Sequence, residues 1–516
     1  MEIKPLIGLG GVLLAAITSE INDQVPNIAL ADIRGAMGIS YDPGTWIQSL
    51  YISGETIGMA ISPWIVPALT LRRWSVFGIA LCAITSVLVP LSPNLEALYV
   101  LRCLQGFSGG LLIPLLMTAA VRILTPDIRL YGLAIYALTA TFTPALATTL
   151  AALWTDLVNW RFIFFEAVPL CALAAACAWY GLPQDEPNYR PLELLDWRGL
   201  LLLVIGTGAL STMLFQGDRM DWFNSKFISI LALISAVSIP LLLLNEWFHP
   251  WPLFRLQMLG RRNLAYGGIA LFTFIIVSQA STTVPLQFLQ QVAGYRPLQA
   301  HLVTLEIAAS QLVLLPAMSP LLNRPQVDSR WVTLVGLALM LASCIGSAFL
   351  TPYWNRDQFY FWQAFQAVGQ PMVIMSLLLM ATNSVPDPSD GPFASALVNT
   401  PRALAEATGI WLFQLIGRWR GALHSNRIVD QVGLERWQVI QGNGVLPHNL
   451  PPLLPDGRPR VPNALEMLSR AVHQQVATLT TSDTFLILGG LILCLMAVVL
   501  VLPRRSLPPR IELAQH

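Results

Sequence analysis

Long apolar stretches recur along the whole chain, and they restrict its possible folds more than any other feature. A helix needs about 20 mostly apolar residues to cross the hydrocarbon core of a bilayer. Because lipid offers the backbone no hydrogen-bond partner, each stretch should be a helix and not a strand. We therefore predict an all-α membrane protein with fourteen transmembrane segments, which are Leu6–Leu30, Thr45–Leu69, Trp74–Leu91, Leu95–Ala120, Leu130–Leu153, Phe162–Leu182, Gly199–Phe215, Phe227–Trp247, Leu264–Phe288, Leu298–Leu322, Trp331–Leu350, Phe359–Met380, Phe393–Ile416 and Thr484–Leu502.

The charge content excludes several other classes of protein. Only 11% of the 516 residues are charged, whereas soluble domains carry about 25%. The net charge of +1 gives no field that would attract nucleic acid. The six cysteines lie in apolar stretches without a C-x-x-C pair, so we predict packing roles for them and neither a metal site nor a cofactor.

Basic residues in the short connections predict the orientation in the membrane. With the N-terminus inside, about 15 Lys and Arg residues face the cytoplasm and about six lie in short external connections. Both termini should then be cytoplasmic and the long connection 418–482 external. This connection holds a proline-rich stretch, Pro447–Pro462, and an amphipathic segment, Asn463–Leu479. The amphipathic segment fits either a cap over the mouth of a transporter or a docking surface.

A faint internal repeat divides the chain. Arg102-x-x-Gln105-Gly106 has a counterpart in Gln363-x-x-Gln366-Ala367. Many secondary transporters consist of two such repeats, with the substrate site between them. We predict six-helix halves over residues 1–182 and 264–516, the second including the external connection 418–482. Residues 183–263 would form a linker with two extra transmembrane helices.

Several motifs in a fixed order carry a family resemblance. The fourth segment contains L-x-x-x-R-x-x-Q-G-x-x-x-G, beginning at Leu98. Other motifs are Gly44-Thr45-Trp46, Trp160-Arg161-Phe162, Asp196-Trp197-Arg198-Gly199, Asp221-Trp222-Phe223, Pro252-Leu253-Phe254-Arg255-Leu256, Pro285-Leu286-Gln287-Phe288-Leu289-Gln290 and Asp483-Thr484-Phe485. Over nearly its whole length the chain resembles the EmrB-like, fourteen-helix drug:proton antiporter branch of the major facilitator superfamily.

The resemblance implies a fold, a function and partners. The fold would be the major facilitator fold, in a multi-pass protein of the cell inner membrane. In a Gram-negative host, a periplasmic adaptor and an outer-membrane channel would be partners, besides the lipid bilayer, protons and a small-molecule substrate. The chain departs from the family at two places. The fifth predicted segment contains Ala147–Ala152 where the family has G-P-x-x-G-G, and the first contains Asn22 where the family has an aspartate.

Ionisable residues inside the apolar segments are the candidate proton-coupling sites. A charged side chain at mid-bilayer costs about 2.5–3.5 kcal/mol on insertion scales, so its presence indicates function. Glu20 and Asp23 share one face of the first helix by their spacing with Asn27, which would line the substrate cavity. Glu55 lies near the middle of the second segment. Asp23 could instead be an interfacial carboxylate that only reaches water. Glu55 could instead form a hydrogen bond to a neighbouring helix.

Arg102 is the fourth candidate for proton coupling. It cannot lose its proton and therefore needs a carboxylate or a shell of carbonyl groups as partner. The family resemblance implies that Arg102 keeps a nearby acid deprotonated. Gln105, one turn further along the same segment, would line the substrate cavity. A purely structural role for Arg102 is the alternative.

The remaining polar residues in apolar segments are candidates for the substrate cavity. Glu166 and Glu306 would bind a polar group of the substrate, or else form structural pairs. Arg402 and Glu406 are four residues apart on one helix, so a local salt bridge is the favoured interpretation. His301, Gln287 and Gln290 would contribute further polar groups.

These features predict a transporter and not an enzyme, since neither a nucleophile–base arrangement nor an ATP-binding P-loop occurs in the sequence. An ion gradient would then supply the energy. The leading hypothesis is proton-coupled export of small amphipathic compounds by alternating access. The alternative is a dedicated exporter or importer of one specific metabolite on the same fold.

Overall fold

The computed structural model describes residues 3–125, 128–189, 196–250, 252–260, 262–324, 326–382, 391–434 and 464–501. Within these ranges the regular structure is helical and contains no strand, as the apolar segments predict. The helices up to residue 181 are α1 (Ile3–Ile28), α2 (Leu30–Met37), α3 (Tyr41–Leu69), α4 (Leu71–Leu88), α5 (Leu95–Ile123), α6 (Arg129–Ala152), α7 (Phe162–Phe165) and α8 (Ala167–Gly181). The later helices are α10 (Trp197–Gln216), α11 (Lys226–Phe248), α12 (Arg262–Ser278), α13 (Thr283–Gln291), α14 (Pro297–Leu322), α15 (Ser329–Ala348), α16 (Arg356–Thr382), α17 (Gly391–Leu434) and α19 (Ala464–Val501).

Each of the fourteen predicted segments coincides with helical structure. In the described ranges, 12 helical spans are long and apolar enough to cross a membrane. The two predicted segments outside that set lie in α3 and α17, which are 29 and 44 residues long. Both helices carry many polar residues, and both contribute to the cavity described below. These two helices are less apolar than the other spans because they lie inside the bundle.

Three differences from the sequence predictions concern where helices begin and end. The segment Leu264–Phe288 is two helices, α12 and α13, separated at residues 279–282. The connection 418–482 is helical at both ends, because α17 continues to Leu434 and α19 begins at Ala464. The predicted amphipathic segment is thus the first part of α19 and not a separate helix. The proline-rich stretch lies outside the described residues.

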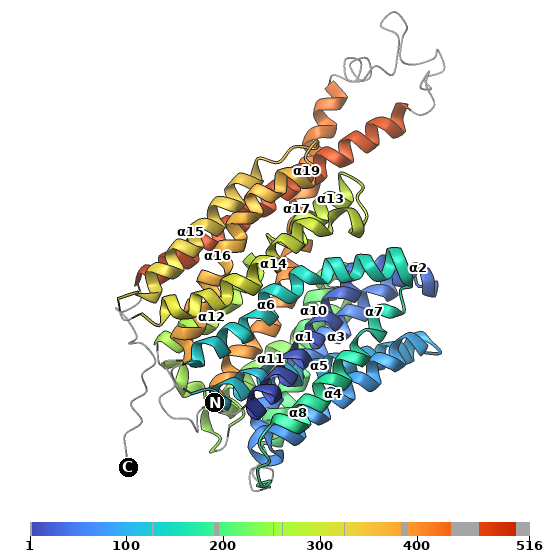
Figure 1. Cartoon of the computed structure of the whole chain (residues 1–516). Coiled ribbons are helices and arrows are strands. Elements are labelled where there is room, and N and C mark those ends of the chain that lie inside the picture. The colour runs from blue at the N-terminus through green and yellow to red at the C-terminus, as the bar shows by residue number, and fades with distance from the viewer. Residues whose placement is uncertain are drawn as a thin grey trace, which may run out of the picture.

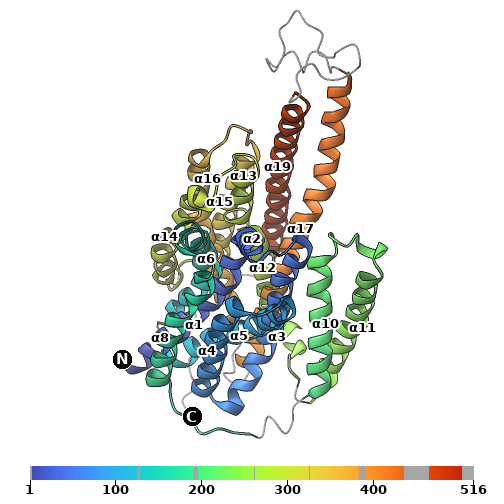
Figure 2. The same cartoon turned by 90° about the vertical axis from the view of Figure 1, so that its right-hand side faces the viewer.

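The helices form two groups with an additional pair at one side. Helices α1–α8 form one group and α12–α19 the other, and α6 packs along α14 where the groups meet (Figure 1). A second contact between the groups joins α3 to α17. Helix α10 packs against α3, with α11 on its outer side (Figure 2). The paired ends of α17 and α19 project beyond the other helices, on the side away from the N-terminus.

Close contact between α3 and α5 fixes the position of Glu55 and Arg102. A Cβ atom added to Gly106 would lie 2.0 Å from the carbonyl oxygen of Tyr51, and one added to Gly110 would lie 2.1 Å from that of Glu55. Only glycine permits such an approach of two helix backbones. The two glycines of the motif in the fourth segment therefore serve helix packing.

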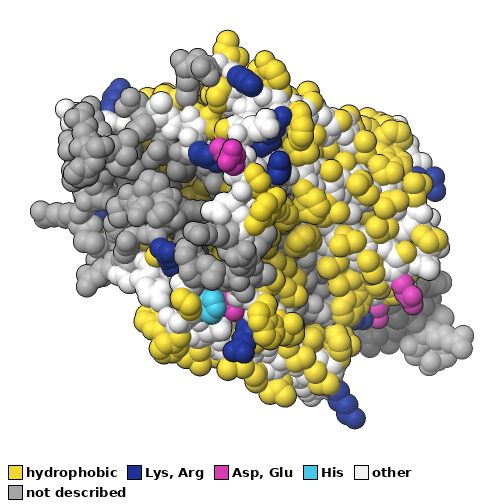
Figure 3. Space-filling model, turned by 90° about the horizontal axis from the view of Figure 1, so that it is seen from below, with side chains coloured by type: hydrophobic (Ala, Val, Ile, Leu, Met, Phe, Trp, Pro, Cys, Tyr) yellow, Lys and Arg dark blue, Asp and Glu magenta, His cyan; other side chains and the backbone are white. Residues whose placement is uncertain are grey.

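The outer surface of the bundle is apolar. Helix α11 exposes Leu233, Leu244 and Phe248, among other large apolar side chains. Hydrophobic side chains also cover much of the face seen in Figure 3, with Lys and Arg residues scattered among them. In a water-soluble protein so much exposed apolar area would promote association. Contact with lipid accounts for it here.

Candidate functional site

A cavity of about 1010 Å³ lies between the two helix groups. The first group contributes residues of α1, α2 and α3, the second contributes residues of α13, α17 and α19 and of the segment before α13, and α10 adds Phe215. The lining residues of α1 lie near the end of that helix remote from the N-terminus, and those of α19 lie toward its projecting start. The cavity therefore belongs to the projecting side of the molecule. We call this side the cavity side and the other the closed side.

Two carboxylates line the cavity. Asp23 accepts hydrogen bonds from Gln48 Nε2 and Gln24 Nε2, both at 2.7 Å. Glu406, 8% exposed, also faces the cavity, and its Oε2 atom is buried without a hydrogen bond. Neither carboxylate forms an ion pair with a basic residue among those described. The charge of these two carboxylates is thus compensated only by the dipoles of hydrogen-bond donors or by more distant basic groups.

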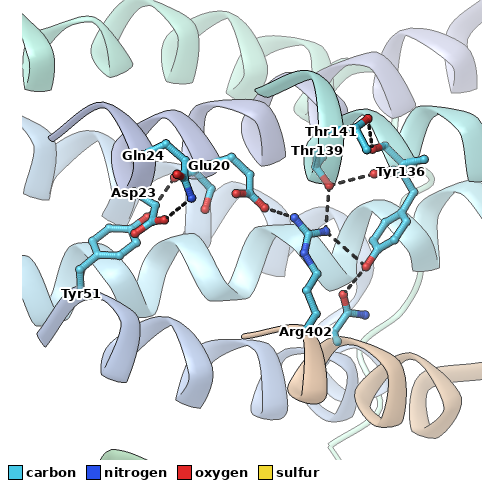
Figure 4. Close-up of polar contacts among 11 residues, drawn as sticks. Glu20, Asp23, Gln24, Tyr51, Tyr136, Thr139, Thr141 and Arg402 are labelled. Atoms are coloured by element: carbon cyan, nitrogen blue, oxygen red, sulfur yellow. Dashed lines mark hydrogen bonds and ion pairs between the residues drawn. The ribbon is translucent and has the colours of Figure 1, made fainter. Parts of the chain in front are cut away.

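An ion pair joins the two helix groups beside the cavity. Glu20 of α1 accepts a hydrogen bond from Arg402 Nη2 of α17 (Figure 4), and each side chain is only 1% exposed. The prediction of a local salt bridge between Arg402 and Glu406 is therefore wrong, because Arg402 pairs with Glu20. The prediction failed because Glu20 offers Arg402 a partner from the other helix group.

Further hydrogen bonds extend this contact toward the closed side. Arg402 Nη1 donates to Thr139 Oγ1 at 3.0 Å and to the hydroxyl of Tyr136 at 3.4 Å. That hydroxyl donates to Asn399 Oδ1 at 2.7 Å. Helix α6 supplies Tyr136 and Thr139, whereas α17 supplies Asn399 and Arg402 (Figure 4). We call Glu20, Tyr136, Thr139, Asn399 and Arg402 the interface network.

Arg102 is surrounded by carbonyl groups, one of the two environments predicted for it. Its Nη1 atom donates to the backbone oxygen of Asn22 at 3.1 Å and to Gln105 Oε1 at 2.7 Å. Its Nε atom donates to the backbone oxygen of Ile47 at 3.4 Å. The guanidinium also lies 4.4 Å from the ring centroid of Tyr51. Arg102 thereby connects α1, α3 and α5, and its contact with α1 is at Asn22, the residue next to Asp23.

Glu55 is fully buried on α3, and neither of its carboxylate oxygens has a hydrogen-bond partner. The alternative of a hydrogen bond to a neighbouring helix is therefore not realised. Glu55 does not line the cavity, but it lies within electrostatic range of Glu406, Asp23 and Glu20. A buried carboxylate without partners is costly in its charged form, and this favours a protonated Glu55.

The other candidates separate into two sets. Asn27 and Gln287 line the cavity, as do Asp23 and Glu406. Gln105, Glu166 and Glu306 do not, nor do Gln290 and His301. Gln105 donates to Ser86 Oγ and thus holds α5 against α4. Glu166 accepts a hydrogen bond from Trp154 Nε1, and Glu306 is half-buried on α14.

Sequence reasoning missed several residues of the site. Tyr136, Thr139 and Asn399 complete the interface network, and Gln48 holds Asp23. Gln48 could have been noticed as an amide inside an apolar segment. Tyr136 and Thr139 had no comparable signal, because such residues are common in membrane helices. Among the described residues, no group of three or more His, Cys, Asp or Glu could hold a metal ion.

Two groups of membrane-crossing helices around one cavity, with an ion pair joining the groups beside it, define a membrane transporter of the secondary type. A family model described as the Major Facilitator Superfamily matches residues 12–277. The chain belongs to this family.

Several individual relatives resemble the chain over most of its length. It is 28% identical to the multidrug export protein EmrB of Haemophilus influenzae over 433 residues, covering 81% of this chain and 82% of that one. It is 29% identical to the fatty acid resistance protein FarB of Neisseria gonorrhoeae over the same length and shares of the two chains. The probable multidrug resistance protein EmrY of Escherichia coli is 27% identical, over 81% of each chain.

Solved structures of other transporters share the fold of this chain. The proton:xylose symporter XylE, bound to 6-bromo-6-deoxy-D-glucose, matches with a TM-score of 0.55 and 12% identity, over 99% of this chain and 98% of that one. A bacterial homolog of the human lysosomal transporter Spinster, in an inward-facing and unoccupied conformation, has a TM-score of 0.55 and 13% identity, over 98% and 99%. At such low identity these matches concern the fold alone.

Proposed function

We propose that the chain exports small amphipathic compounds in exchange for protons, by alternating access. One observation carries the proposal: acids without basic partners face the cavity, and an ion pair beside them joins the two helix groups. The relatives named for multidrug export support the same activity. A carboxylate that faces the cavity can bind either a proton or a substrate group, which makes the two mutually exclusive.

The acids take different roles in this proposal. Asp23 exchanges protons with the cavity, because its oxygens lie at the cavity wall. Glu20 lies one helical turn away and holds Arg402. Protonation of Glu20 would remove the charge that Arg402 pairs with, and the interface network would then open on the closed side. Glu55 serves as a second proton carrier, and Arg102 fixes the helix ends around Asp23.

The rocking units of this mechanism are residues 1–182 and 264–516, with residues 183–263 as an inserted pair. Both chain termini would lie in the cytoplasm, so the cavity would open to the outside of a cell inner membrane. The projecting ends of α17 and α19 then stand outside the membrane. In a Gram-negative host, a periplasmic adaptor and an outer-membrane channel would be partners at this site.

Transport in proteoliposomes tests the proposal. Purified protein is reconstituted with a pH-sensitive dye inside the vesicles, and a panel of amphipathic compounds is offered under an imposed proton gradient. We expect proton movement opposite to that of the substrate. Asp23→Asn and Glu55→Gln should each abolish gradient-driven transport while leaving the protein folded. Glu96→Gln is the matched control, because Glu96 is exposed at the start of α5.

Undiminished coupled transport in both variants would refute these assignments. Transport without any proton movement would refute the antiport mechanism itself. A dedicated exporter or importer of one metabolite is the second candidate. Transport of a single compound from the panel would favour it.

A further inference from the structure

We propose that the closed side of the molecule binds the headgroup of an anionic phospholipid, at the place where the end of α8 meets the starts of α1 and α4. Four side chains form this site, namely Lys4, Arg72, Trp179 and Tyr180. We call these four residues the headgroup site. They lie apart from the cavity, whose lining residues on α1 belong to the other end of that helix.

Close packing of the helix ends brings the two basic residues together. A Cβ atom added to Gly181 of α8 would lie 2.5 Å from the backbone oxygen of Lys4, so the start of α1 touches the end of α8. Helix α4 also packs along α8, and its residue Arg72 reaches Trp179. Because Trp179 and Tyr180 are consecutive, their Cα atoms are about 3.8 Å apart. The positive charges of both side chains are therefore concentrated at one part of the surface.

Aromatic rings hold both cations at the position of a membrane interface. Lys4 Nζ lies 5.6 Å from the ring centroid of Tyr180, and Arg72 Cζ lies 4.3 Å from that of Trp179. Both rings are exposed on the outer surface of the bundle. Trp and Tyr are enriched at the level of the lipid headgroups. A guanidinium that stacks on a ring keeps the N–H groups at its edge available for phosphate oxygens.

The protein does not neutralise the headgroup site. Among the residues that the structure describes, neither Lys4 nor Arg72 forms an ion pair with a carboxylate. Arg72 Nη1 donates to the uncharged Gln184 at 3.2 Å, and its Nε atom is buried without an acceptor. Asp185, the next residue after Gln184, is already paired with Arg122 at 2.7 Å. A phosphate group would supply both the opposite charge and the acceptors.

The neighbouring surface favours a lipid over a soluble anion. Leu173 of α8 is exposed, and its spacing of seven residues places it on the same helix face as Tyr180. Phe77 of α4 is also exposed, and it lies one turn further into the helix than Arg73. These apolar side chains offer contact to an acyl chain, which a free phosphate lacks.

The usual excess of basic residues on the cytoplasmic side is the competing explanation. That excess determines the orientation of many membrane proteins without any bound lipid. It would give all exposed basic residues of the closed side the same role. Arg324, which follows α14 on this side, is exposed and has no ring contact among the described residues. Arg324 is therefore the matched control for Arg72.

Native mass spectrometry of the full chain tests the proposal. Purified, delipidated protein in detergent is titrated with phosphatidylglycerol or with phosphatidylcholine of identical acyl chains, and the bound lipids are counted by mass. We expect the anionic lipid to bind at least about fivefold more tightly, since each basic residue near an anionic surface contributes about a factor of five. Lys4→Gln and Arg72→Gln should each lower the affinity for phosphatidylglycerol about fivefold. Arg324→Gln removes the same charge and should leave this affinity unchanged.

Equal affinity of the two lipids for the unmodified protein would overturn the proposal, and this comparison needs no variant. An equal loss of affinity in Arg324→Gln would overturn it too, because total charge would then explain the binding. So would a preference for phosphatidylglycerol that persists in the double variant Lys4→Gln with Arg72→Gln. Displacement of the lipid by inorganic phosphate, but not by sodium chloride of the same ionic strength, would assign the site to a soluble anion and contradict the lipid. The thermal unfolding temperature of each variant in detergent should equal that of the parent, which separates lost binding from lost folding.

Discussion

Replacement of Glu20 by glutamine should shift the conformational equilibrium of the transporter. In the present conformation Glu20 neutralises Arg402, and both side chains are almost completely buried. Removing one partner of a buried ion pair costs about 3–5 kcal/mol, because the other charge remains without compensation. Opening of the closed side would give Arg402 access to water. Glu20→Gln should therefore favour that opening.

The size of the shift follows from this cost. Each 1.4 kcal/mol corresponds to a factor of about ten, so a loss of 3 kcal/mol shifts the equilibrium about a hundredfold. The double variant Glu20→Gln with Arg402→Gln leaves no isolated charge. The double variant should restore most of the original equilibrium between the two conformations. Comparison of the two singles with the double gives the coupling energy of the pair.

Spin labels report this equilibrium directly. Ser40 and Gly294 are exposed, and they belong to different helix groups near the mouth of the cavity. The distance between labels at these positions should shorten in Glu20→Gln, because closure on the cavity side accompanies opening on the other. A distribution identical to that of the parent protein would refute the role of this ion pair. Glu96→Gln should leave the distances unchanged.

Other variants test the packing and the remaining charges. Gly106→Ala should lower the thermal unfolding temperature markedly, since its Cβ would lie 2.0 Å from the Tyr51 carbonyl oxygen and overpacking costs about 1–3 kcal/mol. Gly208→Ala is its control, because nothing lies within 4 Å of that position, and an unfolding temperature at or above that of the parent is expected. Equal unfolding temperatures for the two variants would contradict the close helix contact. Arg102→Lys should lose about 1.5–3 kcal/mol of stability in denaturant titrations, because one ammonium cannot reach the three acceptors of the guanidinium. Stability equal to that of the parent would show that these bonds contribute little. Arg296→Ala should change transport rates only slightly, since its pairs with Asp156 and Asp32 involve a side chain that is 62% exposed; a large loss in the vesicle assay would assign it a larger role.

The sequence predicts most of the fold because the bilayer imposes a simple rule. Apolar segments of sufficient length become helices, and all fourteen predicted segments coincide with helical structure, although only 12 described spans are long and apolar enough to cross a membrane. The rule fails at Leu434, where α17 ends well beyond the predicted boundary at Ile416. Polar residues after Ile416 look like a loop by hydropathy, yet they continue the helix. Packing against α19 supports the helix there, with Arg420 and His424 of α17 in contact with Asp483 of α19.

The site was predictable only in part. The positions of Glu20, Asp23 and Glu55 within apolar helices indicated function, because charge is costly there. The partner of Arg402 was not predictable, since Glu20 lies 382 residues away in the chain and Glu406 offered a nearer one. Sequence spacing shows which residues are neighbours on one helix, but it does not show which residues of distant helices come into contact in the folded protein. Glu166 and Glu306 show the opposite error, because acids in apolar segments also occur away from a cavity.

Proton release on ligand binding tests the coupling mechanism most directly. Purified protein in weakly buffered detergent solution is mixed with a compound that the vesicle screen identifies as a substrate, and the pH is recorded. If substrate and proton compete for the cavity carboxylates, we expect binding to release protons, and we expect Asp23→Asn to reduce the amount. Substrate binding without any proton release, in the parent protein and at several starting pH values, would contradict coupling through these acids.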